Sequence, residues 1–132
     1  MRQIRLQTER KTQLVDITHE VRDALGDDAA GAAALVYVPH TTAGVAINEH
    51  LDPELLTDFE DALALIVGDG WTWRHDDVDG PNAPSHVRAS LIGPQVLVPL
   101  DGSRLALGTY QGIFFCEFDG PRERKVYVTT LA

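Results

Sequence analysis

The chain has 132 residues, of which 44% are hydrophobic and 23% are charged. This length and composition predict a single domain over residues 1–132, and no repeat or linker divides it. The formal net charge of −9 excludes broad binding to nucleic acid or to anionic membranes, because both reward clustered Lys and Arg. The only cysteine, Cys116, excludes an internal disulfide.

The same sequence indicates where the protein works and what it can bind. Its N-terminus lacks a hydrophobic signal core, and no apolar run approaches the roughly 20 residues that span a bilayer. We therefore expect a cytoplasmic protein without a membrane partner. An anionic substrate would need a local basic patch, for which Arg122, Arg124 and Lys125 are the obvious candidates.

Two strands and one helix are expected in the first third of the chain. Alternating polar and apolar residues over 3–8 predict a half-buried strand. The apolar spacing over 16–25 predicts a short helix capped by Asp16 or Thr18. The continuous apolar run over 32–38 predicts a strand buried on both faces.

The most regular pattern is that of a helix that begins at Asp52-Pro53-Glu54. An N-cap residue, a proline at the first helical position and an acid near the positive end of the helix dipole stand there in order. An apolar stripe with a 3.6-residue period follows. Its members are Leu55, Leu56, Phe59, Ala62, Leu63 and Ile66.

Residues 68–84 are rich in glycine, proline and aspartate, which predicts a long exposed loop of a kind that is often functional. A short helix is expected over 85–91, with Val87, Leu91 and Ser90 inward. Earlier in the chain, residues 44–47 have a strand pattern. Further strand patterns follow the helix over 95–100, 104–107, 113–118 and 125–131. Strands that cluster toward the C-terminus predict an α+β fold, a strand-rich sandwich with two or three helices.

Three histidines stand among small, polar or acidic residues instead of inside apolar runs: His40, His75 and His86. Three imidazoles can hold a divalent metal ion such as Zn²⁺ and leave a fourth position for water or substrate. Their spacing matches no short metal motif, so a joint site and three separate surface histidines are both open. Thr41 and Thr42 could likewise bind a phosphate or cap a turn.

The acidic loop has two interpretations. Asp77-x-Asp79-Gly80 fits the middle of a calcium-binding EF-hand loop, but the ligands required at its first and last positions are missing. This excludes an EF-hand. The acids could bind a hard cation or orient His75, and the alternative is that they are simply solvated.

Two residues of the predicted strand over 113–118 face opposite sides. Cys116 lies between two phenylalanines on one face, which is typical of a buried, inert cysteine. Glu117 shares the other face with apolar residues, so it should be paired or bound to a metal, and it is a candidate general base. The alternative for Glu117 is a salt bridge to Arg122 or Arg124 across the turn.

Several separate blocks, taken in order, resemble the YjbQ-like family. They are His40-Thr41-Thr42-Ala43-Gly44, Asn48-Glu49, Asp52-Pro53, the aromatic-x-His block at His75, Pro84-Ser85-His86, Leu107-Gly108-Thr109-Tyr110-Gln111-Gly112, and Glu117 with Gly120-Pro121-Arg122. The resemblance covers nearly the whole chain. Trp73 stands where the family usually has Tyr, and Tyr110 where it usually has Trp; both swaps keep a large aromatic ring with a polar tip.

The resemblance implies a small α+β protein that assembles as a homotrimer. It also implies that His40, His75 and His86 come together as a metal-binding or catalytic cluster, and that Glu117 has a role. Members of the family carry the label secondary thiamine-phosphate synthase. That reaction joins a thiazole phosphate to a pyrimidine diphosphate and releases pyrophosphate.

We therefore expect an enzyme of small phosphorylated metabolites that resembles a thiamine-phosphate synthase. A metal on the three histidines would polarise a phosphate oxygen or activate water. His86 and Glu117 would serve catalysis, Arg122 would hold an anionic group, and Thr41 and Thr42 would bind the ligand. The alternatives are a metal-dependent phosphate-ester hydrolase that uses the same site, and a trimeric metal- or ligand-binding protein without turnover.

Overall fold

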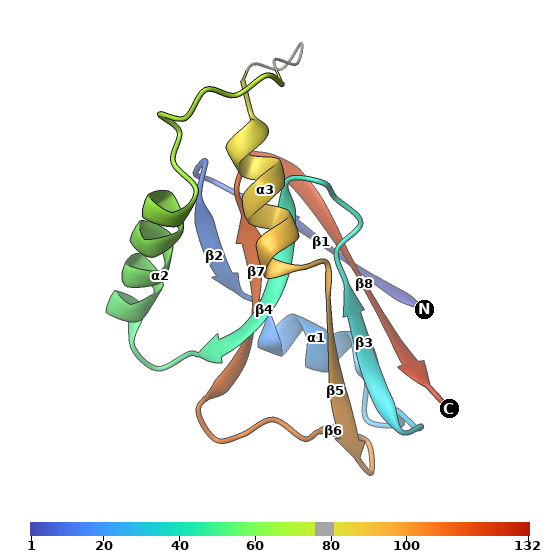
Figure 1. The fold of residues 1–132 in the computed structure, drawn as a ribbon. Coiled ribbons are helices and arrows are strands. Elements are labelled where there is room, and N and C mark those ends of the chain that lie inside the picture. The colour runs from blue at the N-terminus through green and yellow to red at the C-terminus, as the bar shows by residue number, and fades with distance from the viewer. Residues whose placement is uncertain (76–80) are drawn as a thin grey trace.

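The computed structural model describes residues 1–75 and 81–132, which form three helices and eight strands (Figure 1). In chain order these are β1 (Arg2–Gln7), β2 (Gln13–Asp16), α1 (Thr18–Leu25), β3 (Ala33–Tyr37), β4 (Ala43–Glu49), α2 (Pro53–Ile66), α3 (Ala83–Ile92), β5 (Gln95–Asp101), β6 (Arg104–Leu105), β7 (Gln111–Glu117) and β8 (Glu123–Leu131). The acidic residues of the predicted loop, Asp76, Asp77 and Asp79, lie outside the described residues.

The strands form two antiparallel sheets. One has five strands in the order β1-β8-β3-β5-β6, and the other has three in the order β2-β7-β4. Sheets built of antiparallel strands, with helices in separate segments, confirm the predicted α+β class. No helix within residues 1–75 and 81–132 is long and apolar enough to cross a membrane.

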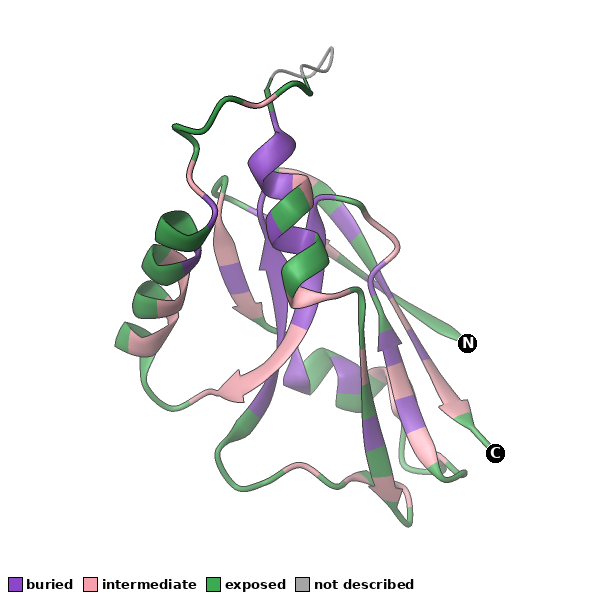
Figure 2. Ribbon diagram, viewed as in Figure 1, coloured by how far each residue is buried: buried purple, intermediate pink, exposed green. Residues whose placement is uncertain are grey.

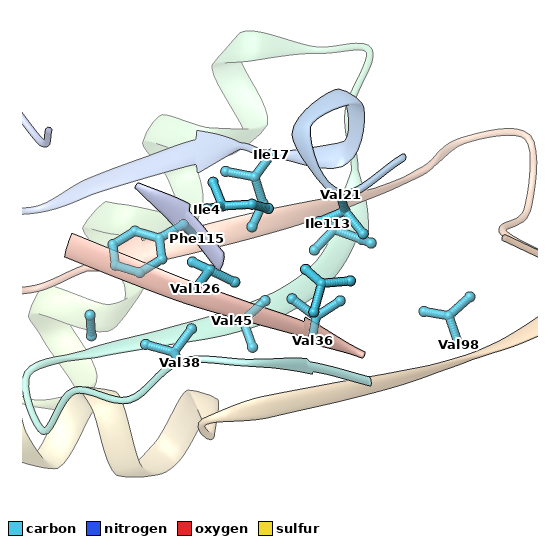
Figure 3. Packing of buried hydrophobic residues seen from close by; sticks show 12 residues of the cluster. Ile4, Ile17, Val21, Val36, Val38, Val45, Val98, Ile113, Phe115 and Val126 are labelled. Carbon is cyan, nitrogen blue, oxygen red and sulfur yellow. The ribbon is translucent and has the colours of Figure 1, made fainter. Parts of the chain in front are cut away.

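The main core lies between the two sheets and is closed at one end by α1 (Figure 3). Successive strand residues point to opposite faces, so every second residue of β8 enters this core. Val126 and Val128 are buried there, and Arg124, two residues earlier, points to the same side and is only 4% exposed. The strand period therefore places one cation at the edge of an apolar core.

β7 is buried on both faces, because the two sheets enclose one side and the helices α2 and α3 cover the other. Its Phe115 joins the core between the sheets, whereas Phe114 and Cys116 pack in the second cluster under the helices. This confirms the predicted environment of Cys116. Burial, with a smaller contribution from Glu60, raises the pKa of the Cys116 thiol to about 12.

The start of α2 confirms the sequence prediction, but its apolar stripe is only partly covered. The Asp52 carboxylate accepts a hydrogen bond of 3.0 Å from the backbone N–H of Glu54. Much of α2 is exposed (Figure 2). Leu63 is buried, whereas Ala62 is exposed and Ile66 is 61% exposed. The predicted helix is therefore present, but the end of its apolar stripe lies exposed in a single chain.

α3 turns the opposite face inward from the one predicted. Val87, Ser90 and Leu91 are exposed, whereas Arg88 and Ala89 are buried. The prediction failed because apolarity was taken as the sign of burial, although a buried polar group with a partner is also stable. The Arg88 guanidinium donates to the carbonyl oxygen of Val67, at the end of α2, over 2.6 Å.

Sequence patterns do not predict β2, whose four residues are too few for an alternation to stand out. At the end of this strand, the Asp16 carboxylate accepts hydrogen bonds from the backbone N–H and the hydroxyl of Thr18, at 2.9 and 2.6 Å. Asp16 therefore satisfies the first turn of α1 as predicted, although the residue at the N-cap position is Ile17.

Candidate functional site

The predicted site residues gather where the β3–β4 connection and the start of α3 meet the turn between β7 and β8 (Figure 1). These segments enclose a pocket of about 600 Å³, which we call the polar pocket. Its lining residues are Tyr37, Val38, Pro39, His40, Thr41, Thr42, Asn82, His86, Pro94, Asp119, Arg122 and Arg124. Five of the seven predicted site residues are among them: His40, Thr41, Thr42, His86 and Arg122.

The three histidines form a chain of neighbours and not a closed cluster. His40 and His86 share the polar pocket. His75 does not line it, but its ring packs edge-to-face against that of His86, with 5.0 Å between ring centroids. Among residues 1–75 and 81–132, no three His, Cys, Asp or Glu side chains lie close enough together to hold a metal ion.

His40 is held in one tautomer. Its Nε2 accepts a hydrogen bond of 2.9 Å from the backbone N–H of Lys125, the third residue of β8. A ring nitrogen that accepts is unprotonated, so the proton of the neutral ring lies on Nδ1. Burial, and next the Arg124 cation, lower the pKa of His40 below its ordinary 6.5. His40 is therefore a neutral hydrogen-bond donor near pH 7.

Glu117 is completely buried and forms an ion pair with Arg124 beneath the polar pocket. Its Oε1 accepts bonds of 2.7 Å from both the Thr8 hydroxyl and Arg124 Nε. Its Oε2 accepts from Arg124 Nη2 and from the backbone N–H groups of Phe118 and Asp119. Five donors saturate the roughly four lone-pair sites of a carboxylate.

Arg124 links this buried carboxylate to the pocket. Its Nη2 also donates to the Thr42 hydroxyl at 2.8 Å, so the guanidinium is fixed from two sides. An arginine keeps its charge at any ordinary pH, and its planar fork suits bidentate contact with phosphate or carboxylate. Because Arg124 lines the pocket while its pair is hidden behind it, the pocket wall carries an oriented positive group.

Arg122 lies on the rim of the same pocket and is oriented by Asp119. Arg122 Nε donates to the Asp119 backbone oxygen at 2.8 Å, and Nη2 to its carboxylate at 2.9 Å. Asn82 donates to that carboxylate as well, at 3.0 Å. The Asn82 Oδ1 atom is buried and has no hydrogen-bond partner in the described part of the chain.

The two threonines differ in exposure and in use. Thr42 is 6% exposed, and its side chain is taken up by Arg124. Thr41 is exposed and lines both the polar pocket and a smaller pocket beside it. Of the two, Thr41 has its hydroxyl available to a ligand.

Sequence analysis named Arg124 as part of a basic patch and, beside Arg122, as the alternative salt-bridge partner of Glu117. The ion pair between Arg124 and Glu117 confirms that alternative. Thr8 and Asn82 were missed. The sequence did hold a signal for the burial of Arg124. Alternate residues of a strand share one face, so Arg124 lies on the same inward face as Val126 and Val128. Thr8 and Asn82 gave no such signal. Thr8 meets Glu117 across 109 positions of the chain, and only the pairing of β1 with β8 brings it there.

A family model described as "UPF0047 protein YjbQ-like" matches residues 2–132. The UPF0047 protein MJ1081 of Methanocaldococcus jannaschii is 42% identical over 125 residues, which cover 93% of this chain and 88% of that protein. The UPF0047 protein YugU of Bacillus subtilis is 37% identical over 132 residues, covering 97% and 96%. The crystal structure of an uncharacterized conserved protein of the YjbQ/UPF0047 family from Clostridium acetobutylicum superposes with a TM-score of 0.89, at 39% identity and with 96% and 97% of the two chains covered.

Proposed function

Because the chain belongs to the YjbQ-like UPF0047 family, we propose that its polar pocket is the active site of an enzyme that acts on small phosphorylated metabolites. The observation that carries the proposal is the buried Arg124, which is paired behind the pocket and lines it in front. A chain with net charge −9 repels anions in general, so a built-in cationic wall favours an anionic ligand at this one place.

Three kinds of donor support phosphate as the anionic group. Arg124 and Arg122 offer fixed guanidinium groups, each with a carboxylate partner that sets its direction. His40 offers Nδ1–H in its neutral form, and Thr41 offers a hydroxyl. Fixed donors of this kind stabilise charge that develops on a leaving phosphate or pyrophosphate, because they need no rearrangement when the reaction occurs.

A divalent metal, zinc by preference, is part of the proposal. Two of the histidines fit it in kind, because the rings of His75 and His86 are neighbours. His40, across the pocket, would join them only after losing its Nδ1 proton or giving up the hydrogen bond that its Nε2 accepts from Lys125. Coordination by all three imidazoles requires their rings to come closer together. When bound, such an ion supplies a Lewis acid for a phosphate oxygen.

We assign proton transfer to His86 and orientation to Glu117. His86 is half-buried and lies between His40 and His75 on the pocket wall, where an imidazole can exchange a proton with a bound ligand. Glu117 was the other candidate base, but its oxygens already accept five hydrogen bonds. Its part is therefore to hold Arg124 in position.

The reaction proposed is the one that the family label names, the joining of a thiazole phosphate to a pyrimidine diphosphate. The test incubates the protein with both substrates and zinc, and measures thiamine phosphate and pyrophosphate. We expect product with the unchanged protein and at least a tenfold loss in His86→Asn, which removes a general acid–base group. His19→Asn is the matched control, because His19 lies on α1 with its side chain 82% exposed.

The other outcomes separate the alternatives. Release of phosphate from phosphate esters, with no thiamine phosphate formed, would show that the protein is a hydrolase that uses the same residues and not a transferase. Metal bound tightly without any turnover would favour a binding protein. Equal activity in His86→Asn and His19→Asn would overturn the assignment of this pocket.

We further propose that the protein is a homotrimer whose copies meet on the outer face of the five-stranded sheet. An apolar patch lies there, outside both core clusters. Its members are Leu35, Tyr37, Leu97, Tyr127 and Leu131. Leu97 is 56% exposed and Tyr37 39% exposed, and exposed aromatic and aliphatic side chains gathered on one face are typical of interfaces. Tyr37 also lines the polar pocket, so a neighbouring copy would reach the rim of the site.

A further inference from the structure

A second pocket adjoins the polar pocket and has a different character. It has a volume of about 330 Å³ and shares His86 with the polar pocket. Its lining residues are Trp73, His75, Ala83, His86 and Val87. Apart from the two imidazoles, these side chains offer only hydrocarbon and aromatic surface, so we call it the aromatic pocket.

The indole ring of Trp73 is fixed in place before any ligand arrives. Its Nε1–H donates to the carbonyl oxygen of Gly68 over 3.1 Å. Its ring stacks on Trp71, with 5.4 Å between centroids and 15° between planes. Trp71 does not line the pocket, so it supports Trp73 from outside. A ring held in this way offers its surface at little cost in side-chain entropy.

We propose that the aromatic pocket holds a flat ring of the same molecule whose phosphate contacts Arg124, and that Trp73 selects ring-bearing phosphates over aliphatic ones. The inference rests on the proposed function, because it takes the polar pocket as the phosphate site. His86 lines both pockets, so one ligand can extend from the polar pocket into the aromatic pocket alongside this imidazole.

The size and the surface of the pocket both favour an aromatic occupant. A closed apolar cavity of about 150 Å³ is enough to bind benzene, so a pocket of about 330 Å³ has room for one ring and its substituents. Aromatic rings gain from offset or edge-to-face contact beyond the area that they bury. Trp73 and the rings of His75 and His86 offer such contacts on more than one side.

The test compares the affinities of phenyl phosphate and ethyl phosphate by calorimetry, since the two probes carry the same anionic group and differ in the ring. We expect the unchanged protein to bind phenyl phosphate about tenfold more tightly. Trp73→Leu should lose this preference while its affinity for ethyl phosphate stays the same. Trp73→Tyr, which keeps an aromatic face, should retain most of the preference.

Tyr110→Leu is the matched control, because Tyr110 is 61% exposed and lines neither pocket. Equal affinity of the unchanged protein for both probes would overturn the aromatic pocket and leave the phosphate site intact. A preference for phenyl phosphate that survives in Trp73→Leu would show that Trp73 does not select the ring. Failure of both probes to bind, with inorganic phosphate also unbound, would instead overturn the proposed function itself.

Discussion

Glu117 and Arg124 show how one buried pair can serve both stability and the site. Taking either charge out of water is costly, and the cost is offset only while the partner and the other hydrogen bonds are present. The Thr8 hydroxyl and two backbone N–H groups complete the arrangement around Glu117. Loss of one partner therefore leaves the other buried and uncompensated.

From this geometry we predict that Glu117→Gln destabilises the fold by about 3–5 kcal/mol, the range for breaking a buried ion pair. Urea denaturation followed by circular dichroism measures the change. Glu123→Gln is the control, because Glu123 pairs with Arg5 at 3.6 Å while both side chains are about two-thirds exposed. That change should stay within about 0.5 kcal/mol. Equal losses in the two variants would contradict the buried-pair account.

Cys116 provides a prediction that depends on pH. Only the thiolate reacts with alkylating agents, and burial holds the pKa of this thiol at about 12. We expect iodoacetamide at pH 8.5 to leave the folded protein unmodified for hours and to add one group quickly in 8 M urea, as read by mass spectrometry. Between pH 9.0 and about 12 the unfolded chain loses this proton and the folded chain keeps it, so this thiol lowers stability as the pH rises.

Fast alkylation of the folded protein would contradict this prediction, because it would show that Cys116 is accessible.

The same residue illustrates how much could be predicted from the sequence at the scale of single residues. The burial of Cys116 and the facing of Glu117 follow from strand alternation alone. Of the partners of Glu117, Arg124 was one of two candidates across the turn, seven residues away. Thr8 could not be foreseen, because it lies 109 positions away and only the pairing of β1 with β8 brings it there.

At the scale of single elements, α2 can be tested at its first turn. Asp52→Ala removes the acceptor of the Glu54 N–H bond, which should cost about 1 kcal/mol, as is typical of a lost N-cap. Asp58→Ala, on the exposed surface of the same helix, should be neutral or slightly stabilising because alanine favours helix. Thermal unfolding of the two variants measures the difference, and a smaller loss in Asp52→Ala than in Asp58→Ala would contradict the cap.

The elements also show which patterns carry information in this chain. The start of α2 agrees with the structure because its cap signals coincide there. The apolar run over 32–38 does form β3, but the prediction that both of its faces are buried is wrong for a single chain, since Ala34 and Val36 are buried while Tyr37 on the other face is 39% exposed. The predicted inward face of α3 was wrong because the buried face includes Ser85, whose hydroxyl donates to the carbonyl oxygen of Phe118 over 2.6 Å. Such a polar contact is invisible to a hydrophobic period. It also places His86, the next residue, at the pocket wall.

At the scale of the whole molecule, two apolar surfaces are candidates for the contact between copies in the proposed trimer. One is the outer face of the five-stranded sheet, which reaches the polar pocket through Tyr37. The other is the solvent side of α2, where Leu65 is 85% exposed and Ile66 61% exposed. The outward positions of β3 carry no charge, whereas exposed acids such as Asp58 and Asp61 lie on α2. In a chain of net charge −9, copies approach one another more easily around β3, at the centre of the sheet, which lacks such acids.

We therefore predict that Leu97→Glu, on the sheet face, dissociates the trimer, and that Leu65→Glu leaves it intact. A buried charge without a partner would cost several kcal/mol at each copy of the interface, enough to shift assembly by orders of magnitude. Light scattering coupled to size exclusion should give three times 14.5 kDa for the unchanged protein and for Leu65→Glu, and a single mass of 14.5 kDa for Leu97→Glu. The reverse result would move the interface to α2, and a monomeric unchanged protein would overturn the assembly.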